Sequence, residues 1–179
     1  MLSAKVFNRD ISGWDVGSVT DMSYMFDKAS SFNQNISFWD VNKVTNMRSM
    51  FNSAKVFNQD ISNWDVGSIT EMNDMFCWTD EFNQNISQWD VSSVVDMSGM
   101  FYEALAFNQD ISQWDVSSIT DMSFMFFGAK VFNQDLSGWD ITSVTDHNNF
   151  SSNTCPLYVE YHPDENWADE KDLNEPTIG

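Results

Sequence analysis

The sequence is poor in basic residues. Lysine and arginine together number 8 against 27 aspartate and glutamate residues, so the 179-residue chain carries a formal net charge of −19. Affinity for DNA or RNA comes mainly from Lys and Arg side chains that replace the counterions of the phosphates. We therefore expect no nucleic-acid partner, and the same charge argues against docking on anionic lipid.

Cysteine, histidine and long apolar runs are also scarce. The two cysteines, Cys77 and Cys155, are too few for a disulfide scaffold or a zinc site. His147 and His162 lie at or beyond the end of a repeated region and near no nucleophile motif, so we expect no enzyme. No apolar run approaches the roughly 18 residues of a spanning helix, so we expect no membrane insertion. The residues after Met1 do not predict a secretory leader.

The chain is organised by a repeat of 25 residues that keeps its register from residue 4 to residue 146. The unit contains Phe-Asn-Gln-Asp-Ile-Ser-x-Trp-Asp-Val and, further along, Met-x-x-Met-Phe. We call the residues at one position of successive repeats a column. Three columns are the tryptophans Trp14, Trp39, Trp64, Trp89, Trp114 and Trp139, the aspartates Asp15, Asp40, Asp65, Asp90, Asp115 and Asp140, and the asparagines Asn8, Asn33, Asn58, Asn83, Asn108 and Asn133. Such a period is typical of a solenoid, because stacking buries the apolar face that one coil cannot bury alone.

Within each repeat the spacing predicts one strand and one short helical segment. Ile11, Trp14 and Val16 have the spacing of a leucine-rich-repeat strand. Apolar residues then follow at steps of three and four up to Phe32, and Thr20 precedes them as a helix-capping residue. We therefore expect an α/β repeat, a leucine-rich-repeat-like solenoid of about six coils, with a parallel sheet along one face.

The two sequence blocks resemble the BspA-like leucine-rich repeats of bacterial and protist surface proteins, in particular the 25-residue surface-protein variety abundant in mycoplasmas. The resemblance covers about residues 1–146. It implies a right-handed solenoid that takes part in adhesion and protein recognition, without catalytic residues. An extracellular or cell-surface location is expected on this resemblance alone.

Three segments are expected along the chain. Residues 1–146 form the solenoid, without an N-terminal cap. His147 stands where methionine is due and the register breaks after it, so 147–161 is expected to be a C-terminal cap. Residues 162–179 are acidic and poor in apolar side chains, which predicts a tail or linker.

The aspartates that follow the tryptophans are the first candidate site. Six carboxylates stacked at strand spacing would repel one another, and a weakly associated Ca²⁺ could relieve this. Alternatively, each carboxylate accepts a backbone N–H from the turn that follows it. Beyond weak calcium association, no cofactor is expected.

The remaining columns are expected to hold the structure together. The tryptophans share a face with core positions such as Val16, so we expect them to be buried, although a row of exposed indoles would suit sugar rings. The Met and Phe columns are expected in the core, and the Asn and Ser columns as side-chain ladders between coils. A Ser-x-Thr pattern beginning at Ser18 also resembles the hydroxyl array of ice-binding solenoids.

These patterns predict a non-enzymatic recognition or adhesion module that presents an elongated acidic face to a protein or glycan partner. Selectivity would come from variable positions beside the aspartates, among them Phe38, Asn63, Gln88 and Gln113. One alternative is a filament or surface layer formed by self-association through the solenoid ends. A further alternative is an ice- or mineral-binding solenoid.

Overall fold

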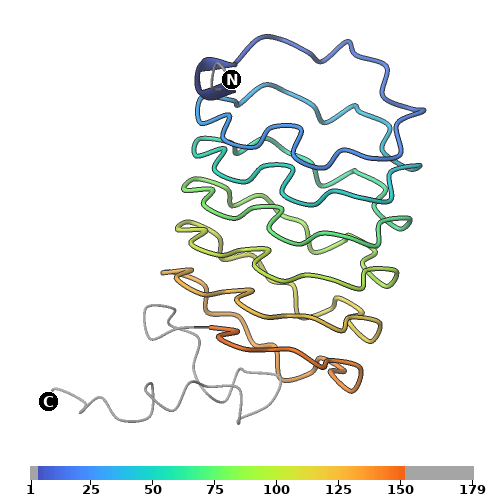
Figure 1. Ribbon diagram of the computed structural model, residues 1–179, viewed down its shortest axis with the longest axis vertical. Coiled ribbons are helices and arrows are strands. Elements are labelled where there is room, and N and C mark those ends of the chain that lie inside the picture. The colour runs from blue at the N-terminus through green and yellow to red at the C-terminus, as the bar shows by residue number, and fades with distance from the viewer. Residues whose placement is uncertain (1–3, 152–179) are drawn as a thin grey trace, which may run out of the picture.

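The computed structural model describes residues 4–151 and shows a stack of similar coils, one for each repeat (Figure 1). Residues 25 apart in the sequence lie next to each other in neighbouring coils. Isolated backbone bridges, all parallel, record this register at Asp21–Asn46, Asn46–Glu71, Glu71–Asp96, Asp96–Asp121 and Asp121–Asp146. The predicted superposition of equivalent side chains is therefore confirmed.

The coils contain almost no regular secondary structure. Within residues 4–151 the one helix is η1, a 3-10 helix over Ala4–Val6, and no strand extends beyond a single bridge residue. The fold prediction is wrong on this point. The molecule is not an α/β leucine-rich-repeat-like solenoid, since its coils have neither the strand nor the helical turn, and no parallel sheet forms along one face.

The segment predicted as helical is a series of tight turns. Met25 N–H donates to Met22 O (3.3 Å), whereas Tyr24 N–H donates to Arg48 O in the next coil (2.9 Å). Tyr24 and Lys28 have φ angles of 59° and 60°, in the left-handed region that a right-handed helix cannot contain. Successive four-residue turns place every third or fourth residue on one side, as a helix does. The apolar spacing therefore could not distinguish the two structures.

The left-handed conformation recurs in two columns of the stack. These are Tyr24, Ser49, Asp74, Gly99, Phe124 and Asn149, and Lys28, Ser53, Trp78, Glu103 and Gly128. The predicted helix cap is also wrong, because Asp21 Oδ1 accepts Ser23 N–H (2.8 Å) in a local turn and Thr20 O accepts Thr45 N–H (2.9 Å) from the next coil.

The segment predicted as a strand also folds into turns. Trp14 N–H donates to Ile11 O (3.0 Å), and Gly17 N–H donates to Asp15 Oδ1 (3.1 Å). These N–H groups are used locally and cannot form a sheet ladder. The indole N–H of Trp39, in the next coil, donates to Ile11 O (3.3 Å). A tryptophan side chain thus joins the coils where a backbone ladder was expected.

The core is made of stacked aromatic columns. The Phe26 and Phe51 rings lie 5.6 Å apart across coils, and Phe26 and Phe32 lie 3.9 Å apart within one coil. The same pair of contacts repeats as far as Phe126–Phe132 (4.0 Å). The methionines of both columns are buried from Met47 to Met125, which confirms the predicted core.

Burial of the tryptophans is confirmed for five of the six. Trp39, Trp64, Trp89, Trp114 and Trp139 are only 4–5 % exposed. Trp14 differs from the prediction, because it is 53 % exposed. It belongs to the first coil, which lies at the N-terminal end of the stack (Figure 1), and its ring stacks on that of Trp39 in the second coil at 6.4 Å.

The last described residues extend the packing of the stack. Phe150 is buried, and its ring meets that of Phe126 edge to face at 5.4 Å. Residues 152–161 of the predicted cap and the predicted tail 162–179 lie outside the described part of the chain. In the part that is described, no helix has both the length and the apolar character needed to cross a membrane.

Candidate functional site

The aspartates that follow the tryptophans each close a turn. Asp15, Asp40, Asp65, Asp90, Asp115 and Asp140 accept the N–H two residues further on, at 3.1–3.3 Å. Hydrogen bonds from the Ser92 hydroxyl and N–H lower the pKa of Asp90. The turn interpretation of this column is therefore confirmed. Residues 4–151 contain no group of three or more His, Cys, Asp or Glu that could hold a metal ion.

The variable positions beside these aspartates are solvent-exposed. Phe38 is 85 % exposed, and Asn63, Gln88 and Gln113 are exposed as well. Gln113 lies in a shallow polar groove of about 340 Å³ together with Asp110 and Asp135. This face is therefore accessible, polar and acidic.

The asparagine column connects the coils through side chains. Asn8 Oδ1 accepts both the N–H of Asn33 and the Nε2 of Gln34, each at 2.9 Å. The pattern repeats from coil to coil up to Asn108, which accepts from Asn133 N (3.0 Å) and Gln134 Nε2 (2.8 Å). The predicted ladder is confirmed, although the side-chain donor is glutamine rather than asparagine.

The serine column and the threonines of the Ser-x-Thr pattern form hydrogen bonds within the stack. The N–H of Ser12 donates to Asp10 Oδ1 in the same coil (2.9 Å), so the serines form local turns rather than the predicted ladder between coils. The Thr45 hydroxyl donates to Thr20 O in the preceding coil (3.3 Å), and Thr70, Thr120 and Thr145 bind the same way. These threonine hydroxyls are therefore engaged with backbone, which weakens the ice-binding interpretation.

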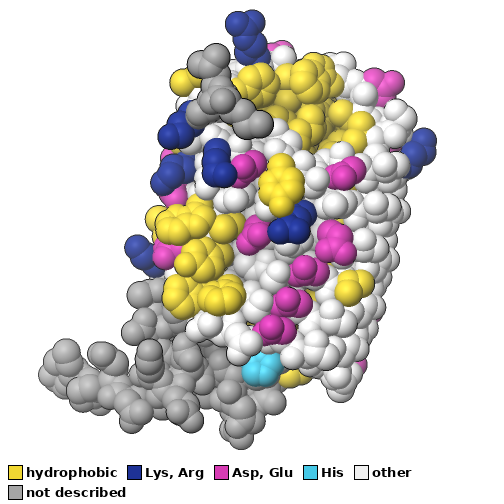
Figure 2. Space-filling model, viewed as in Figure 1, with side chains coloured by type: hydrophobic (Ala, Val, Ile, Leu, Met, Phe, Trp, Pro, Cys, Tyr) yellow, Lys and Arg dark blue, Asp and Glu magenta, His cyan; other side chains and the backbone are white. Residues whose placement is uncertain are grey.

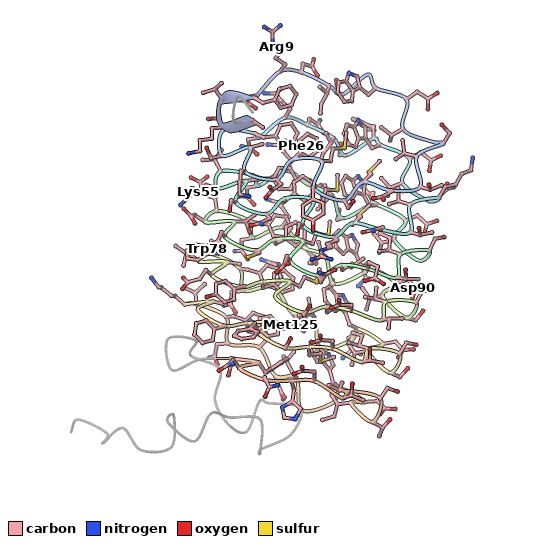
Figure 3. All side chains as sticks on the ribbon, viewed as in Figure 1. Arg9, Phe26, Lys55, Trp78, Asp90 and Met125 are labelled. Carbon is pink, nitrogen blue, oxygen red and sulfur yellow. The ribbon has the colours of Figure 1, made fainter. Side chains whose placement is uncertain are left out.

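A second surface, which the sequence did not predict, is lined by aromatic side chains. We call it the aromatic groove. Its volume is about 440 Å³, and its lining residues are Asp74, Cys77, Trp78, Ser98, Gly99, Tyr102, Ser123 and Phe124. Figure 3 places Trp78 at the opposite edge of the stack from Asp90. The groove is thus separate from the face that carries the predicted aspartates.

The aromatic side chains of the groove form one continuous cluster over three coils. The Trp78 and Tyr102 rings are 5.7 Å apart, the Tyr102 and Phe124 rings 6.2 Å, and the Tyr102 and Phe127 rings 5.3 Å. Trp78 is 43 % exposed and Phe124 is 40 % exposed. Figure 2 shows hydrophobic side chains gathered on this side of the molecule, next to a column of acidic side chains.

Asp74 supplies a carboxylate to the groove. A Cβ atom on Gly99 would lie only 2.5 Å from Asp74 Oδ1, so this glycine makes room for the carboxylate. Burial raises the pKa of Asp74, the charge of Arg48 opposes this, and the charge of Asp96 raises the pKa further. The groove therefore combines aromatic faces with a partly desolvated acidic group.

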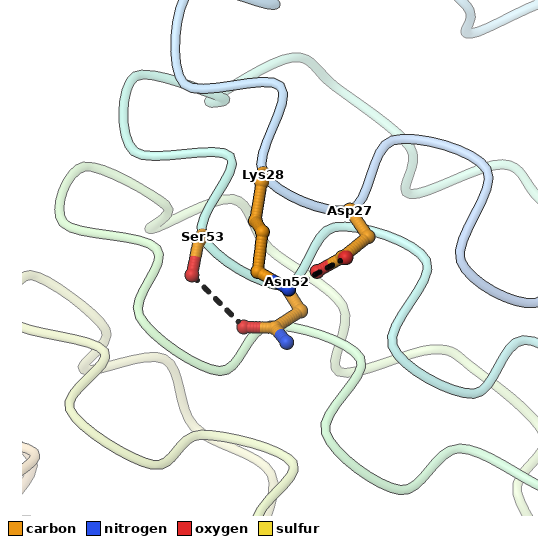
Figure 4. Close-up of polar contacts among 4 residues, drawn as sticks. All are labelled: Asp27, Lys28, Asn52 and Ser53. Atoms are coloured by element: carbon orange, nitrogen blue, oxygen red, sulfur yellow. Dashed lines mark hydrogen bonds and ion pairs between the residues drawn. The ribbon is translucent and has the colours of Figure 1, made fainter. Parts of the chain in front are cut away.

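Two columns of the groove, those of Cys77 and Trp78, are polar in the first two coils. There the positions equivalent to Cys77 and Trp78 are held by Asp27 and Lys28, which form an ion pair (3.2 Å), and by Asn52 and Ser53, which form a hydrogen bond (3.1 Å) (Figure 4). The aromatic character begins at Trp78. Aromatic residues in columns that vary between repeats were the signal in the sequence, but it became readable only once the coils were known to stack.

The fold and these surfaces define a repeat protein whose coils are joined by turns and side-chain ladders. The chain matches the family model described as "Mycoplasma protein of unknown function, DUF285" twice, over residues 1–76 and 58–158. These matches cover more than half of the sequence, and the chain therefore belongs to that family. No curated protein matches the chain, and no solved structure matches it.

Proposed function

We propose that the protein is a non-enzymatic recognition module of the mycoplasma cell surface, which adheres to a partner through the aromatic groove. Family membership supports the mycoplasma setting, and the sequence resemblance to surface-protein repeats supports the location. The observation that carries the proposal is the surface aromatic cluster, in which Trp78 and Phe124 are exposed and Tyr102 is half-buried. Contiguous exposed apolar surface of this kind marks interaction sites in soluble proteins.

The groove has the composition of a binding surface. Tryptophan and tyrosine dominate the residues that contribute most to binding energy at protein interfaces. Their amphipathic rings also provide large contact area with little loss of conformational freedom. Trp78 and Tyr102 lie in columns that hold polar residues in the first two coils, so the coil fold itself does not require aromatic side chains there.

The test is adhesion of the labelled protein to host cells. We expect the double variant Trp78→Ala/Tyr102→Ala to lose at least tenfold in bound protein. The matched control is Phe38→Ala, which removes an aromatic residue that is 85 % exposed on the other face. Loss of adhesion in Phe38→Ala alone would transfer the function to the acidic face, and adhesion unchanged in both variants would contradict the proposal.

The location requires a separate measurement. We expect brief protease treatment of intact mycoplasma cells to digest the protein, while a cytosolic marker remains intact. Protection of the protein from the protease until the cells are lysed would contradict the surface assignment.

A second candidate function is self-association through the N-terminal end of the stack. Trp14 is 53 % exposed there, and Val6 is 86 % exposed. Figure 2 shows a hydrophobic area at that end. Sedimentation velocity should then show concentration-dependent assembly that Trp14→Ser weakens. A monomer at all concentrations would rule this function out.

A further inference from the structure

We infer that the aromatic groove binds an arginine side chain presented by a basic segment of a partner protein. The inference rests on the proposed function and specifies the chemistry of the partner. Aromatic faces attract cations through their quadrupole, and a guanidinium can stack on a ring while it forms two hydrogen bonds to a carboxylate. The aromatic groove offers both elements, the rings of Trp78 and Tyr102 and the carboxylate of Asp74.

The pairing of an arginine with an aromatic ring also occurs elsewhere on the surface of this chain, in the coils before the groove. The guanidinium carbon of Arg48 lies 5.7 Å from the centre of the Tyr24 ring. The charge of Arg48 also reaches Asp74, where it opposes the rise in pKa that burial causes. The chain therefore already pairs an arginine with an exposed aromatic ring, and the charge of the same arginine acts on this carboxylate.

The repeat register shows what differs at the groove. The positions equivalent to Arg48 in later coils are Asn73, Ser98, Ser123 and Asn148, of which Ser98 and Ser123 line the groove. The positions equivalent to Tyr24 at the groove are Asp74, Gly99 and Phe124, of which Phe124 is aromatic. The Arg48 column thus has no further cation, and the rings of Trp78 and Phe124 stay 43 % and 40 % exposed beside the two serines. An arginine from another chain would supply the missing cation.

The charge around the groove favours a basic partner. The backbone bridges place Glu71, Asp96, Asp121 and Asp146 in one column, and Ser98 and Ser123 belong to the turns that Asp96 and Asp121 close (2.8 Å each). The ion pairs Lys28–Asp27 and Lys55–Asp80 involve none of the groove residues. With a net charge of −19, the chain attracts basic segments and repels acidic ones over several ångströms.

The groove also favours arginine over lysine. It is open and shallow, so a compact ammonium ion would remain hydrated, whereas a planar guanidinium is weakly hydrated and stacks on aromatic faces. We therefore expect a peptide with arginine to bind more tightly than the same peptide with lysine.

The test is calorimetric titration of the full chain with a short peptide that carries two arginines and no other charged residue. The comparison peptides carry lysine or citrulline at the same positions, since citrulline keeps the shape of arginine and removes the charge. We expect binding at least tenfold weaker with citrulline, intermediate with lysine, and weaker as salt increases. Asp74→Asn and Trp78→Ala should each reduce affinity at least fivefold, whereas Asp90→Asn on the other face should not.

Several outcomes would overturn the inference. These are equal affinity for the arginine and citrulline peptides, and binding that Asp90→Asn weakens as much as Asp74→Asn does. Binding of neutral oligosaccharides or phosphatidylcholine vesicles that Trp78→Ala abolishes, without binding of the arginine peptide, would also overturn it. In that last case the groove would still be the recognition site, so the proposed function would stand while its ligand chemistry changed. Near-ultraviolet circular dichroism of each variant verifies that the coils remain folded.

Discussion

Aspartate and asparagine are interchangeable at the turn that precedes each tryptophan. Asp60 accepts the N–H of Ser62 at 3.0 Å, and Asn85 accepts the N–H of Ser87 at the same distance. The turn therefore needs a side-chain oxygen two residues before the serine, and the negative charge is a separate property. This separation allows charge and fold to be tested independently.

Replacing Asp60 and Asp110 by asparagine should make stability less dependent on acid. Bonds from the hydroxyl and N–H of Ser62 lower the pKa of Asp60 below 3.8, and bonds from the N–H and hydroxyl of Ser112 lower that of Asp110. A lowered folded-state pKa contributes stability above the ordinary value and loses it as the pH falls through the folded-state value. Melting temperatures between pH 7 and pH 2 should fall less in Asp60→Asn/Asp110→Asn than in the original chain. An unchanged pH profile would contradict this role.

Cys77 should be unreactive at neutral pH. Burial, followed by the charges of Asp74, Asp27 and Glu103, raises the pKa of this thiol to about 12. The thiolate is the reactive form, so alkylation by iodoacetamide in a Cys155→Ser background should be slow at pH 8 and rapid after unfolding. The stability gained by burying the neutral thiol is present below pH 9.0 and is lost between pH 9.0 and about 12. Equal alkylation rates for folded and unfolded protein would show that Cys77 is accessible.

At the scale of the structural element, each coil is held to the next by side chains on one side and by backbone on the other. Along the turns from Met22 to Lys28, alternate N–H groups donate to carbonyls of the next coil. Along the opposite side, Asn58 Oδ1 accepts Asn83 N (3.0 Å) and Gln84 Nε2 (2.9 Å). The asparagine ladder therefore has the role that a sheet ladder has elsewhere.

Removing one step of this ladder should destabilise the protein measurably. Asn58→Ala removes the acceptor of the Asn83 N–H and of Gln84 Nε2, which costs about 0.5–1.5 kcal/mol for each hydrogen bond, or a melting temperature lower by roughly 2–4 °C per kcal/mol. The control, Asn63→Ala, removes an exposed amide and should change stability by less than about 0.5 kcal/mol. Equal melting temperatures for the two variants would refute a structural role for the ladder.

The sequence predicted the period, the superposition of equivalent residues and the core columns, because these depend on spacing alone. It also predicted the turns that the aspartates close, as one of two interpretations, but it did not predict the turns from Met22 to Lys28. Met22, Met25 and Phe26 have the same spacing in consecutive turns as in a helix, and the left-handed column contains Tyr24 and Phe124, which give no such indication. Only Gly99, Asp74 and Asn149 in that column are residues that favour left-handed backbone.

The aromatic groove escaped prediction for a different reason. Trp78, Tyr102 and Phe124 occupy three different columns, so each appears in the sequence as an isolated departure from the repeat. Stacking brings them within 6.2 Å of their neighbours. A recognition surface that runs diagonally across coils is visible only when the register and the path of each coil are both known.

At the scale of the whole molecule, each coil contacts the coils before and after it, so one coil should be removable. Deleting residues 46–70 joins Thr45 to Glu71, which is equivalent to Asn46, and restores every column. We expect this variant to fold cooperatively with reduced stability, as in other repeat proteins whose stability comes from nearest-neighbour interfaces. Deleting residues 46–69 shifts all columns by one residue and should abolish folding. Thermal unfolding followed by near-ultraviolet circular dichroism distinguishes the outcomes, and equal stability of the two deletions would contradict the importance of register.

The near absence of helices and strands in residues 4–151 has a practical consequence for anyone who purifies this protein. Its far-ultraviolet spectrum should show neither the double minimum of helices nor the single minimum of sheets, even when every coil is in place. A standard quality check would therefore classify the native sample as denatured. The ordered rings from Phe26 to Phe132 absorb in the near ultraviolet, and their sharp bands there, lost on heating, are the reliable sign of an intact sample.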